Sequence, residues 1–232
     1  MLHNLDYEAA FGGDYLGLFV VGIRNTLLLF VVCWGVALAL ASILTVVRTI
    51  PNRIIQSLIA AYVEYHRNVP VLVQILVWYF AIPQLLPEVV NNYLNRHDSE
   101  AVYSAIALSL FSAAYMSEDL RSGLRSIPVG QYEAARSVGM SHIKAVRWII
   151  LPQVMRISVV PLVNQTLVLF KATSLASALG VTELTFQTMQ IESQTFRIFE
   201  TLSAATLVYM LVAFALMFAG KTLSQRVKLA RK

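Results

Sequence analysis

The chain has 232 residues, of which 57% are hydrophobic and only 13% are charged. A water-soluble domain of this length needs more polar surface, so this composition excludes an ordinary soluble protein. The formal net charge is +5. Because most basic residues flank apolar stretches, this charge gives no reason to expect nucleic-acid binding. The composition predicts an integral membrane protein.

Five apolar stretches follow one another along the chain, and each is a candidate membrane-spanning helix. Thr26–Val47 has 22 residues and Thr201–Gly220 has 20, and neither contains a charged side chain. About 20 residues of helix cross roughly 30 Å of hydrocarbon. Three weaker stretches lie between them, namely Val69–Pro87, Ala101–Met116 and Ile149–Phe170. The sequence therefore predicts an all-α polytopic membrane protein with five transmembrane helices.

Lysine and arginine alternate between scarce and abundant from one connecting segment to the next. Residues 1–23 contain none, whereas residues 121–148 and the tail 221–232 contain five each. Because cytoplasmic loops carry the excess of basic residues, the N-terminus is expected in the periplasm and the C-terminus in the cytoplasm. We expect one membrane domain over 1–232, with a core at 15–225 and a basic cytoplasmic tail at 221–232.

Motifs for catalysis or metal binding are missing from the sequence. The four histidines are scattered without metal-ligand spacing: His3, His66, His97 and His142. Ala219-Gly220-Lys221-Thr222 resembles the end of the nucleotide-binding motif G-x-x-x-x-G-K-S/T, but Ala215 occupies the place of its first glycine. We therefore expect no catalytic residue, no metal and no directly bound cofactor.

The segment between Arg121 and Trp148 combines charged and small residues with turn-forming ones. Pro128 and Gly130 mark a turn, and Gly139 permits the positive φ that ends a short helix. These features alone fit two alternatives. The segment is either an ordinary cytoplasmic loop with one short helix or a surface that receives another protein.

The spacing of this segment resembles the EAA loop of ABC importer permeases, EAA-x3-G-x9-I-x-LP. The matching residues are Glu133, Ala134, Ala135, Gly139, Ile149, Leu151 and Pro152. The resemblance implies the type I ABC importer permease architecture, with 121–152 as a cytoplasmic coupling loop. It implies that the loop contacts a separate ATPase through Glu133, that Gly139 shapes the turn, and that the ATPase uses the ATP.

Several other segments are similar to the polar-amino-acid branch of these permeases. They are Arg48–Arg53, Tyr62–Glu64, Arg67–Gln74, Trp78-Tyr79, Ile82–Glu88 and Lys171–Ser177. The later ones resemble a glutamate/aspartate permease subunit, although the family commonly has Asp or Asn where this chain has Ala172. The resemblance implies a second permease subunit, a copy or a paralogue, and a periplasmic amino-acid-binding protein as partners within the lipid membrane.

Two groups of polar residues adjoin the predicted spans at membrane depth and are candidates for the substrate path. The first is Glu64, Arg67 and Asn68, and the second is Lys171, Thr173 and Ser174. Charges at this depth are costly, so they should face protein or water. Glu64 and Arg67 can instead form an i, i+3 ion pair, and Lys171 can extend to the interface.

The predicted function is an inner-membrane permease subunit of an ATP-driven importer for polar amino acids, glutamate and aspartate first. Two deep cations suit an anionic amino acid. The alternatives are a permease for glutamine or basic amino acids, a secondary transporter or channel that needs no ATPase, and a membrane scaffold that recruits a cytoplasmic partner.

Overall fold

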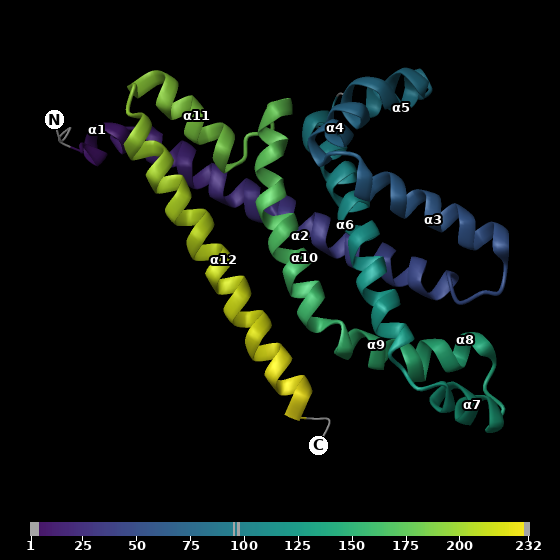
Figure 1. Cartoon of the computed structure of the whole chain (residues 1–232). Coiled ribbons are helices and arrows are strands. Elements are labelled where there is room, and N and C mark those ends of the chain that lie inside the picture. The colour runs from purple at the N-terminus through teal and green to yellow at the C-terminus, as the bar shows by residue number, and fades with distance from the viewer. Residues whose placement is uncertain (1–4, 95, 97, 230–232) are drawn as a thin grey trace. The chain divides into compact units, whose positions relative to one another are not determined.

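Helices make up most of the part of the chain that the computed structural model describes, residues 5–94, 96 and 98–229, with side chains described as far as 225. That part contains no strand. The α-helices, several of which are labelled in Figure 1, are α1 (Tyr7–Phe11), α2 (Tyr15–Val47), α3 (Arg53–Asn68), α4 (Val71–Leu76), α5 (Glu88–Leu94), α6 (Ser99–Arg125), α7 (Val129–Ser137), α8 (His142–Ala145), α9 (Leu151–Ile157), α10 (Val159–Ala172), α11 (Leu184–Thr195) and α12 (Ile198–Leu229).

Three helical segments of the described chain are long and apolar enough to cross a membrane: Tyr15–Val47, Val159–Leu179 and Ile198–Gln225. A fourth is present if α3 and the segment Val71–Leu85 are counted as one broken span. The predicted all-α membrane fold is thus confirmed. The count of five spans and the orientation of the termini stay predictions.

Helix boundaries differ from the apolar stretches of the sequence. α2 begins at Tyr15, eleven residues before Thr26, because a helix continues through polar positions as long as its backbone groups pair. The predicted fourth span, Ile149–Phe170, is interrupted at Ser158, where α9 ends and α10 begins. The apolar segment that can cross the membrane is therefore displaced toward the C-terminus, to Val159–Leu179.

Two wide helical turns precede prolines. In the π-helical turn Val77–Ala81, the N–H of Ile82 bonds the carbonyl of Val77, and Pro83 follows. In the π-helical turn Val146–Ile150, the N–H of Leu151 bonds the carbonyl of Val146, and Pro152 follows. A proline has no N–H and its ring collides with the carbonyl four residues earlier in a regular helix. The wider turn relieves that collision and keeps the helix continuous.

The chain divides into two compact units. Unit 1 consists of Met1–Cys33, Val71–Leu108 and Val168–Ala215. Its apolar core gathers Phe19, Leu184, Ile191 and Ala205 from α2, α11 and α12. Unit 2 consists of Trp34–Pro70, Ser109–Leu167 and Leu216–Lys232. Its largest cluster contains Ala37, Ala41, Ala113, Met116, Leu120, Ile150 and Val154, and the alanines let α2 and α6 approach closely.

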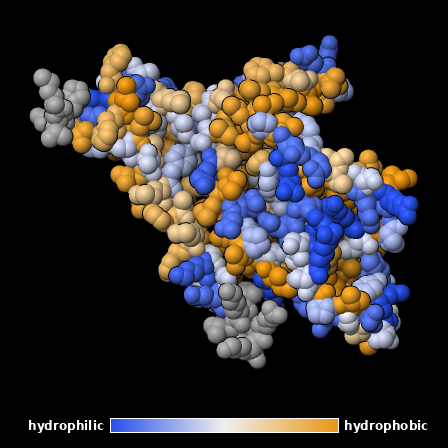
Figure 2. Space-filling model, viewed as in Figure 1, coloured by the Kyte–Doolittle hydropathy of each residue, from blue (hydrophilic) through white to orange (hydrophobic). Residues whose placement is uncertain are grey.

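One side of α12 carries an exposed apolar stripe. Leu207, Leu211, Phe214 and Phe218 recur at helical spacing and are 51%, 65%, 54% and 73% exposed. Figure 2 shows apolar residues along α12, with hydrophilic residues toward its C-terminal end. Only 6% of the apolar window in Ile198–Gln225 is buried within the chain. This surface is available to lipid or to another subunit.

A buried carboxylate joins three helices of unit 1. Glu183 precedes α11 and accepts hydrogen bonds from the backbone N–H groups of Thr185 and Phe186, at 3.0 and 2.8 Å. The hydroxyls of Thr26 in α2 and Tyr209 in α12 also donate to it, at 3.3 and 2.9 Å. Burial raises the pKa of Glu183, and the four donors oppose that rise. The side chain therefore caps α11 and fixes it to both neighbours.

We predict that Glu183→Ala lowers the free energy of unfolding by about 3 kcal/mol or more, because each buried donor left unpaired costs about 1–3 kcal/mol. Tyr209→Phe removes a single donor and should cost about 1 kcal/mol. Thermal and denaturant unfolding of the purified chain in detergent measures both. Glu133→Ala, at an exposed position, is the control and should unfold like the parent. Equal stability of all three variants would contradict the network.

Candidate functional site

The segment predicted to be the coupling loop contains a separate short helix, α7. Pro128 immediately precedes it, and α6 ends just before, at Arg125. Of the three residues of the EAA motif, Glu133 and Ala134 are exposed, whereas Ala135 is buried at 6% exposure. Glu133 forms no ion pair with any residue that the structure describes. Its carboxylate is therefore available to a partner.

A left-handed glycine ends this short helix, as the sequence predicts. Gly139 has a φ of +83°, and its N–H bonds the carbonyl of Arg136 at 3.0 Å. The N–H of Met140 bonds the carbonyl of Ala135 at 3.2 Å. This pair of bonds is a Schellman motif, which closes the end of a helix and reverses the chain. The hydroxyl of Ser141 then caps α8 by accepting a hydrogen bond from the N–H of Lys144.

Several large apolar side chains of the loop are exposed. They are Val129 at 70%, Val138 at 77%, Ile143 at 67% and Trp148 at 65%. Large apolar side chains that a loop leaves exposed are available for contact with another protein. The other end of the motif is anchored inside the chain. Ile150 belongs to the main cluster of unit 2, Leu151 is half-buried and Pro152 is exposed.

A three-residue ion-pair network lies on the helices that lead to the loop. Glu118 of α6 pairs with Arg121 one turn later and with Arg48, which directly follows α2. All three side chains are half-buried, with relative exposures between 16% and 26%. The network fixes α6 to the end of α2. No local sequence pattern indicates this network, because Arg48 and Glu118 are 70 positions apart.

The first group of path candidates lies at the end of α3, in unit 2. The amide of Asn68 donates to the carboxylate of Glu64 at 2.9 Å. The guanidinium of Arg67 lies over the ring of Tyr115, 5.7 Å from its centroid, and the Tyr115 hydroxyl donates to the Arg67 carbonyl at 3.3 Å. The alternative of a Glu64–Arg67 ion pair is therefore not what the structure contains. Arg67 makes a cation–π contact instead.

Asp119 is a polar residue that sequence reasoning overlooked. It follows Tyr115 by one helical turn, so the two residues share a face of α6. Its Oδ2 atom is buried and has no hydrogen-bond partner among the described residues. Its backbone carbonyl accepts a hydrogen bond from the hydroxyl of Ser158 at 3.2 Å. The i, i+4 spacing from Tyr115 was the available signal, but the predicted span ended at Met116.

The second group of candidates lies in unit 1, where α10 tightens into the 3-10 turn Thr173–Leu179. The Thr173 hydroxyl is buried and donates to the carbonyl of Phe170 at 2.7 Å. The Ser174 hydroxyl donates to the carbonyl of Lys171 at 2.8 Å. Both hydroxyls thus serve the local backbone. Lys171 is exposed, and Ala172 is buried at 7% exposure.

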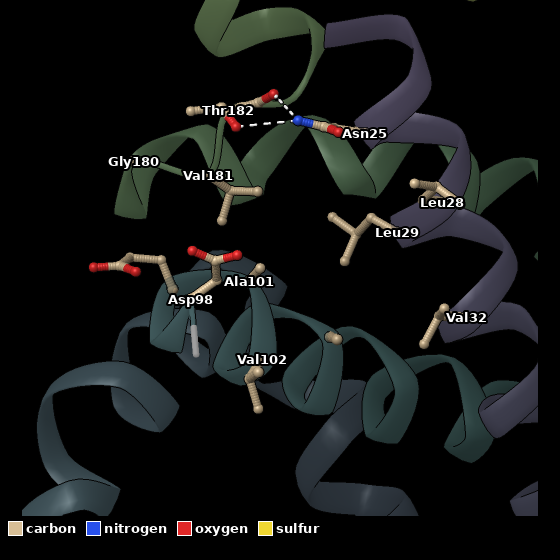
Figure 3. Close-up of a pocket in the computed structure, with 12 residues that line it drawn as sticks. Asn25, Leu28, Leu29, Val32, Asp98, Ala101, Val102, Gly180, Val181 and Thr182 are labelled. Atoms are coloured by element: carbon tan, nitrogen blue, oxygen red, sulfur yellow. Dashed lines mark hydrogen bonds between the residues drawn. The ribbon is translucent and has the colours of Figure 1, made fainter. Parts of the chain in front are cut away.

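Unit 1 also contains a cavity of about 400 Å³ (Figure 3). The amide of Asn25 donates to the carbonyl and the hydroxyl of Thr182 at its rim, at 2.8 and 3.1 Å. Asp98 and Glu100 also line it, together with apolar residues of α2 and α6, and no basic residue within the described part of the chain does. No path candidate lies in this cavity, and its two carboxylates repel an anionic ligand.

Among the described residues, no group of three or more His, Cys, Asp or Glu side chains is placed to hold a metal ion. Two of the four histidines considered in the sequence, His3 and His97, lie outside the described residues. Of the other two, His66 is buried in α3, and His142 begins α8.

Comparison with known proteins places the chain in one family. Residues 15–229 match the family described as "Binding-protein-dependent transport system inner membrane component". The chain is 32% identical over 227 residues to the glutamate/aspartate import permease protein GltJ of Escherichia coli strain K12, covering 96% of this chain and 92% of that one. It is 31% identical over 215 residues to the probable glutamine ABC transporter permease protein GlnM of Bacillus subtilis strain 168, covering 93% and 95%.

The fold agrees with these similarities. The crystal structure of an amino acid ABC transporter with histidines superposes with a TM-score of 0.80 and 26% identity, covering 97% of this chain and all of that one. The family match extends over almost the entire length, including the loop and both groups of polar candidates. The chain therefore belongs to the binding-protein-dependent transport system inner membrane components, and it is a multi-pass permease subunit of an ABC importer.

Proposed function

We propose that this permease carries polar amino acids, glutamate and aspartate first, across the bacterial inner membrane. The observation that supports coupling to ATP is the geometry of α7. It presents Glu133 to the outside, ends at a left-handed Gly139 and lies among exposed apolar side chains. A loop helix with this shape offers a compact surface for a partner, while Ala135 holds its other side against the chain.

The partners in this proposal are two cytoplasmic ATPase subunits, a second permease subunit and a periplasmic amino-acid-binding protein. The permease itself is not an enzyme and binds no cofactor, because ATP is bound and hydrolysed in the ATPases. The apolar stripe of α12 faces lipid or the second permease, whether a copy or a paralogue. The segment 121–152 serves as the coupling loop, and 221–232 is a basic cytoplasmic tail.

The mechanism follows from the rigidity of the loop. ATP binding draws the ATPases together, and each displaces the α7 helix that it contacts. Because the Schellman motif and the packing of Ala135 and Ile150 restrain the loop, α7 moves with the ends of α2 and α6. Such rigid-body displacement of packed helices is a common route to alternating access.

The preference for acidic substrates is supported by the two cations among the path candidates. Arg67 and Lys171 are both exposed within the chain, so each can neutralise a substrate carboxylate. The relatives named for glutamate/aspartate and for glutamine differ in the charge of their cargo. Glutamine and basic amino acids are therefore the alternatives to be tested against glutamate and aspartate.

We predict that Glu133→Ala abolishes ATP-dependent uptake while membrane insertion and unfolding stay unchanged, because the exposed carboxylate contacts only the ATPase. The measurement is uptake of labelled glutamate into proteoliposomes that contain the permease, the ATPase and the binding protein. Uptake by the permease alone, driven by an ion gradient, would contradict the proposed function and favour a secondary transporter.

We predict a graded response at Gly139. Gly139→Ala places a Cβ in the left-handed region, which costs about 1–2 kcal/mol. Because about 1.4 kcal/mol corresponds to a factor of ten, the native turn becomes about tenfold less favoured, and uptake should fall by about the same factor. Gly139→Asn should lose less, because asparagine tolerates this conformation. Gly130→Ala is the matched control, since Gly130 lies within α7, has no positive φ, and a Cβ there meets nothing within 4 Å. Equal uptake of the alanine and asparagine variants would argue against a role for the turn.

We predict that glutamate uptake depends on the charge, rather than the size, of the side chains at Arg67 and Lys171. Arg67→Lys and Lys171→Arg should keep most uptake, whereas Arg67→Met and Lys171→Met should raise the half-saturating glutamate concentration at least tenfold. Competition by aspartate, glutamine and arginine, measured for the parent and the Met variants, reports the preferred cargo. Stronger competition by arginine than by aspartate in the parent would overturn the acidic preference.

A further inference from the structure

One imidazole links three segments of unit 2. His142, the first residue of α8, lies with Nδ1 2.9 Å from the hydroxyl of Tyr132 and with Nε2 2.9 Å from the hydroxyl of Thr49. Tyr132 belongs to α7, and Thr49 lies two residues beyond the end of α2. The His142 ring thus connects the proposed coupling helix to the end of a membrane-spanning helix.

The donor and acceptor in each hydrogen bond of His142 follow from the number of protons available. The Thr49 hydroxyl donates its single proton to the carbonyl of Val46 at 2.7 Å. It therefore accepts from His142, whose proton is on Nε2. In a neutral imidazole the other nitrogen is an acceptor, so the Tyr132 hydroxyl donates to Nδ1. The result is a continuous chain of hydrogen bonds from α7 through His142 to the backbone of α2.

The surroundings of His142 favour a persistent link. His142, Tyr132 and Thr49 line a cavity of about 280 Å³ whose other walls are mainly apolar, including Leu124 and Ile150. Beside apolar walls, water competes less for the bonded groups, and the lower local dielectric makes the hydrogen bond stronger. The Tyr132 and His142 rings also meet edge to face, with centroids 5.7 Å apart.

Tyr132 has a special position in α7. The other side-chain hydrogen bonds of this helix are local, from Ser137 to the Ala134 carbonyl and from Arg136 to the Met140 carbonyl. Among the described residues, the Tyr132–His142 bond is therefore the one side-chain hydrogen bond that ties α7 to another helix. Without it, α7 would be held to the rest of unit 2 by packing and by its backbone connections.

We infer that His142 is a positioning residue for coupling: it clamps α7 to the end of α2, so that a displacement of α7 is passed to the membrane helices. The clamp consists of Tyr132, His142 and Thr49. This inference rests on the proposed function, in which α7 is the helix that the ATPase moves. Loss of the clamp leaves the ATPase contact at Glu133 in place but leaves α7 connected to α2 by packing and backbone alone, so less of its displacement reaches α2.

The first test measures coupling in proteoliposomes with the ATPase and binding protein, as the ratio of amino acid imported to ATP hydrolysed. His142→Ala should lower this ratio about tenfold, while ATP hydrolysis without binding protein stays unchanged. Tyr132→Phe and Thr49→Val each remove one hydroxyl and keep the packing, and each should lower the ratio. The two together should be no worse than His142→Ala, because all three break one chain. Additive losses would overturn the clamp.

Conservative variants separate the two halves of the clamp. Asparagine places its amide oxygen near Nδ1 and keeps the acceptor for Tyr132, whereas glutamine places its amide nitrogen near Nε2 and keeps the donor to Thr49. Both His142→Asn and His142→Gln should lower the ratio, since each restores only one bond. Full coupling in either variant would overturn the requirement for both bonds.

The second test uses the permease alone, so that its result is independent of the proposed function. Spin labels at the exposed positions Gln131 in α7 and Arg53 in α3 report the spread of distances within unit 2. The spread should widen in His142→Ala and Tyr132→Phe and stay narrow in Glu133→Ala. An unchanged spread in His142→Ala overturns the clamp, whatever the uptake. A wider spread in His142→Ala, together with normal uptake in Glu133→Ala, supports the clamp and contradicts the ATPase contact instead.

Discussion

Every backbone N–H and C=O group that enters hydrocarbon needs a partner within the protein, and the rest of this structure depends on that constraint. Helices satisfy it along their length but leave four N–H donors open at the N-terminal end and four carbonyl acceptors open at the C-terminal end. This chain has many helix ends, because its long segments are repeatedly interrupted. Each interruption therefore needs its own solution.

Several different residues provide those solutions. Asn52 caps α3 through the N–H groups of Ile54 and Ile55, Glu183 caps α11 from a buried site, and Gly139 closes α7 by adopting a left-handed conformation. Two of these residues do more than close a helix end: Glu183 also fixes α11 to α2 and α12, and Gly139 shapes the loop.

The constraint also explains where the polar candidates lie. The break at Val69-Pro70 frees carbonyl groups at the end of α3, and Asn68 and Tyr115 occupy that place with Arg67. A polar cluster beside broken helix geometry is costly in a membrane unless it faces protein or water. The break at the end of α3 therefore requires that this cluster face protein or water.

Much of the fold could be predicted from the sequence, because the relevant information is local. Apolar length indicated α2 and α12, and the glycine and proline of the loop indicated where α7 begins and ends. The contacts that organise the site could not be predicted, since they join distant positions. Thr49 and His142 are 93 residues apart, and Thr26 and Glu183 are 157 apart. Nothing in the local pattern of either partner indicates the other.

The choice between alternatives at Glu64 and Arg67 shows a second limit. Their i, i+3 spacing favoured an ion pair, and the structure instead gives Glu64 to Asn68 and Arg67 to Tyr115. Asn68 is one full turn from Glu64 and competes for the same carboxylate. Spacing along a helix identifies which residues can meet, whereas the neighbouring side chains, including those of other helices, determine which of the possible pairs forms.

The π-helical turn Val146–Ile150 has a consequence for the spacing of the EAA motif. Nine residues separate Gly139 from Ile149, and within them the chain leaves the left-handed turn, caps α8 and enters the wide turn. One residue more or fewer would rotate all that follows by about 100° about the helix axis. Ile150 and Val154 would then turn away from the unit 2 cluster while α7 kept its own shape. The nine-residue interval in the motif therefore determines which face of the following helix points toward the unit 2 cluster, rather than how far that helix lies from α7.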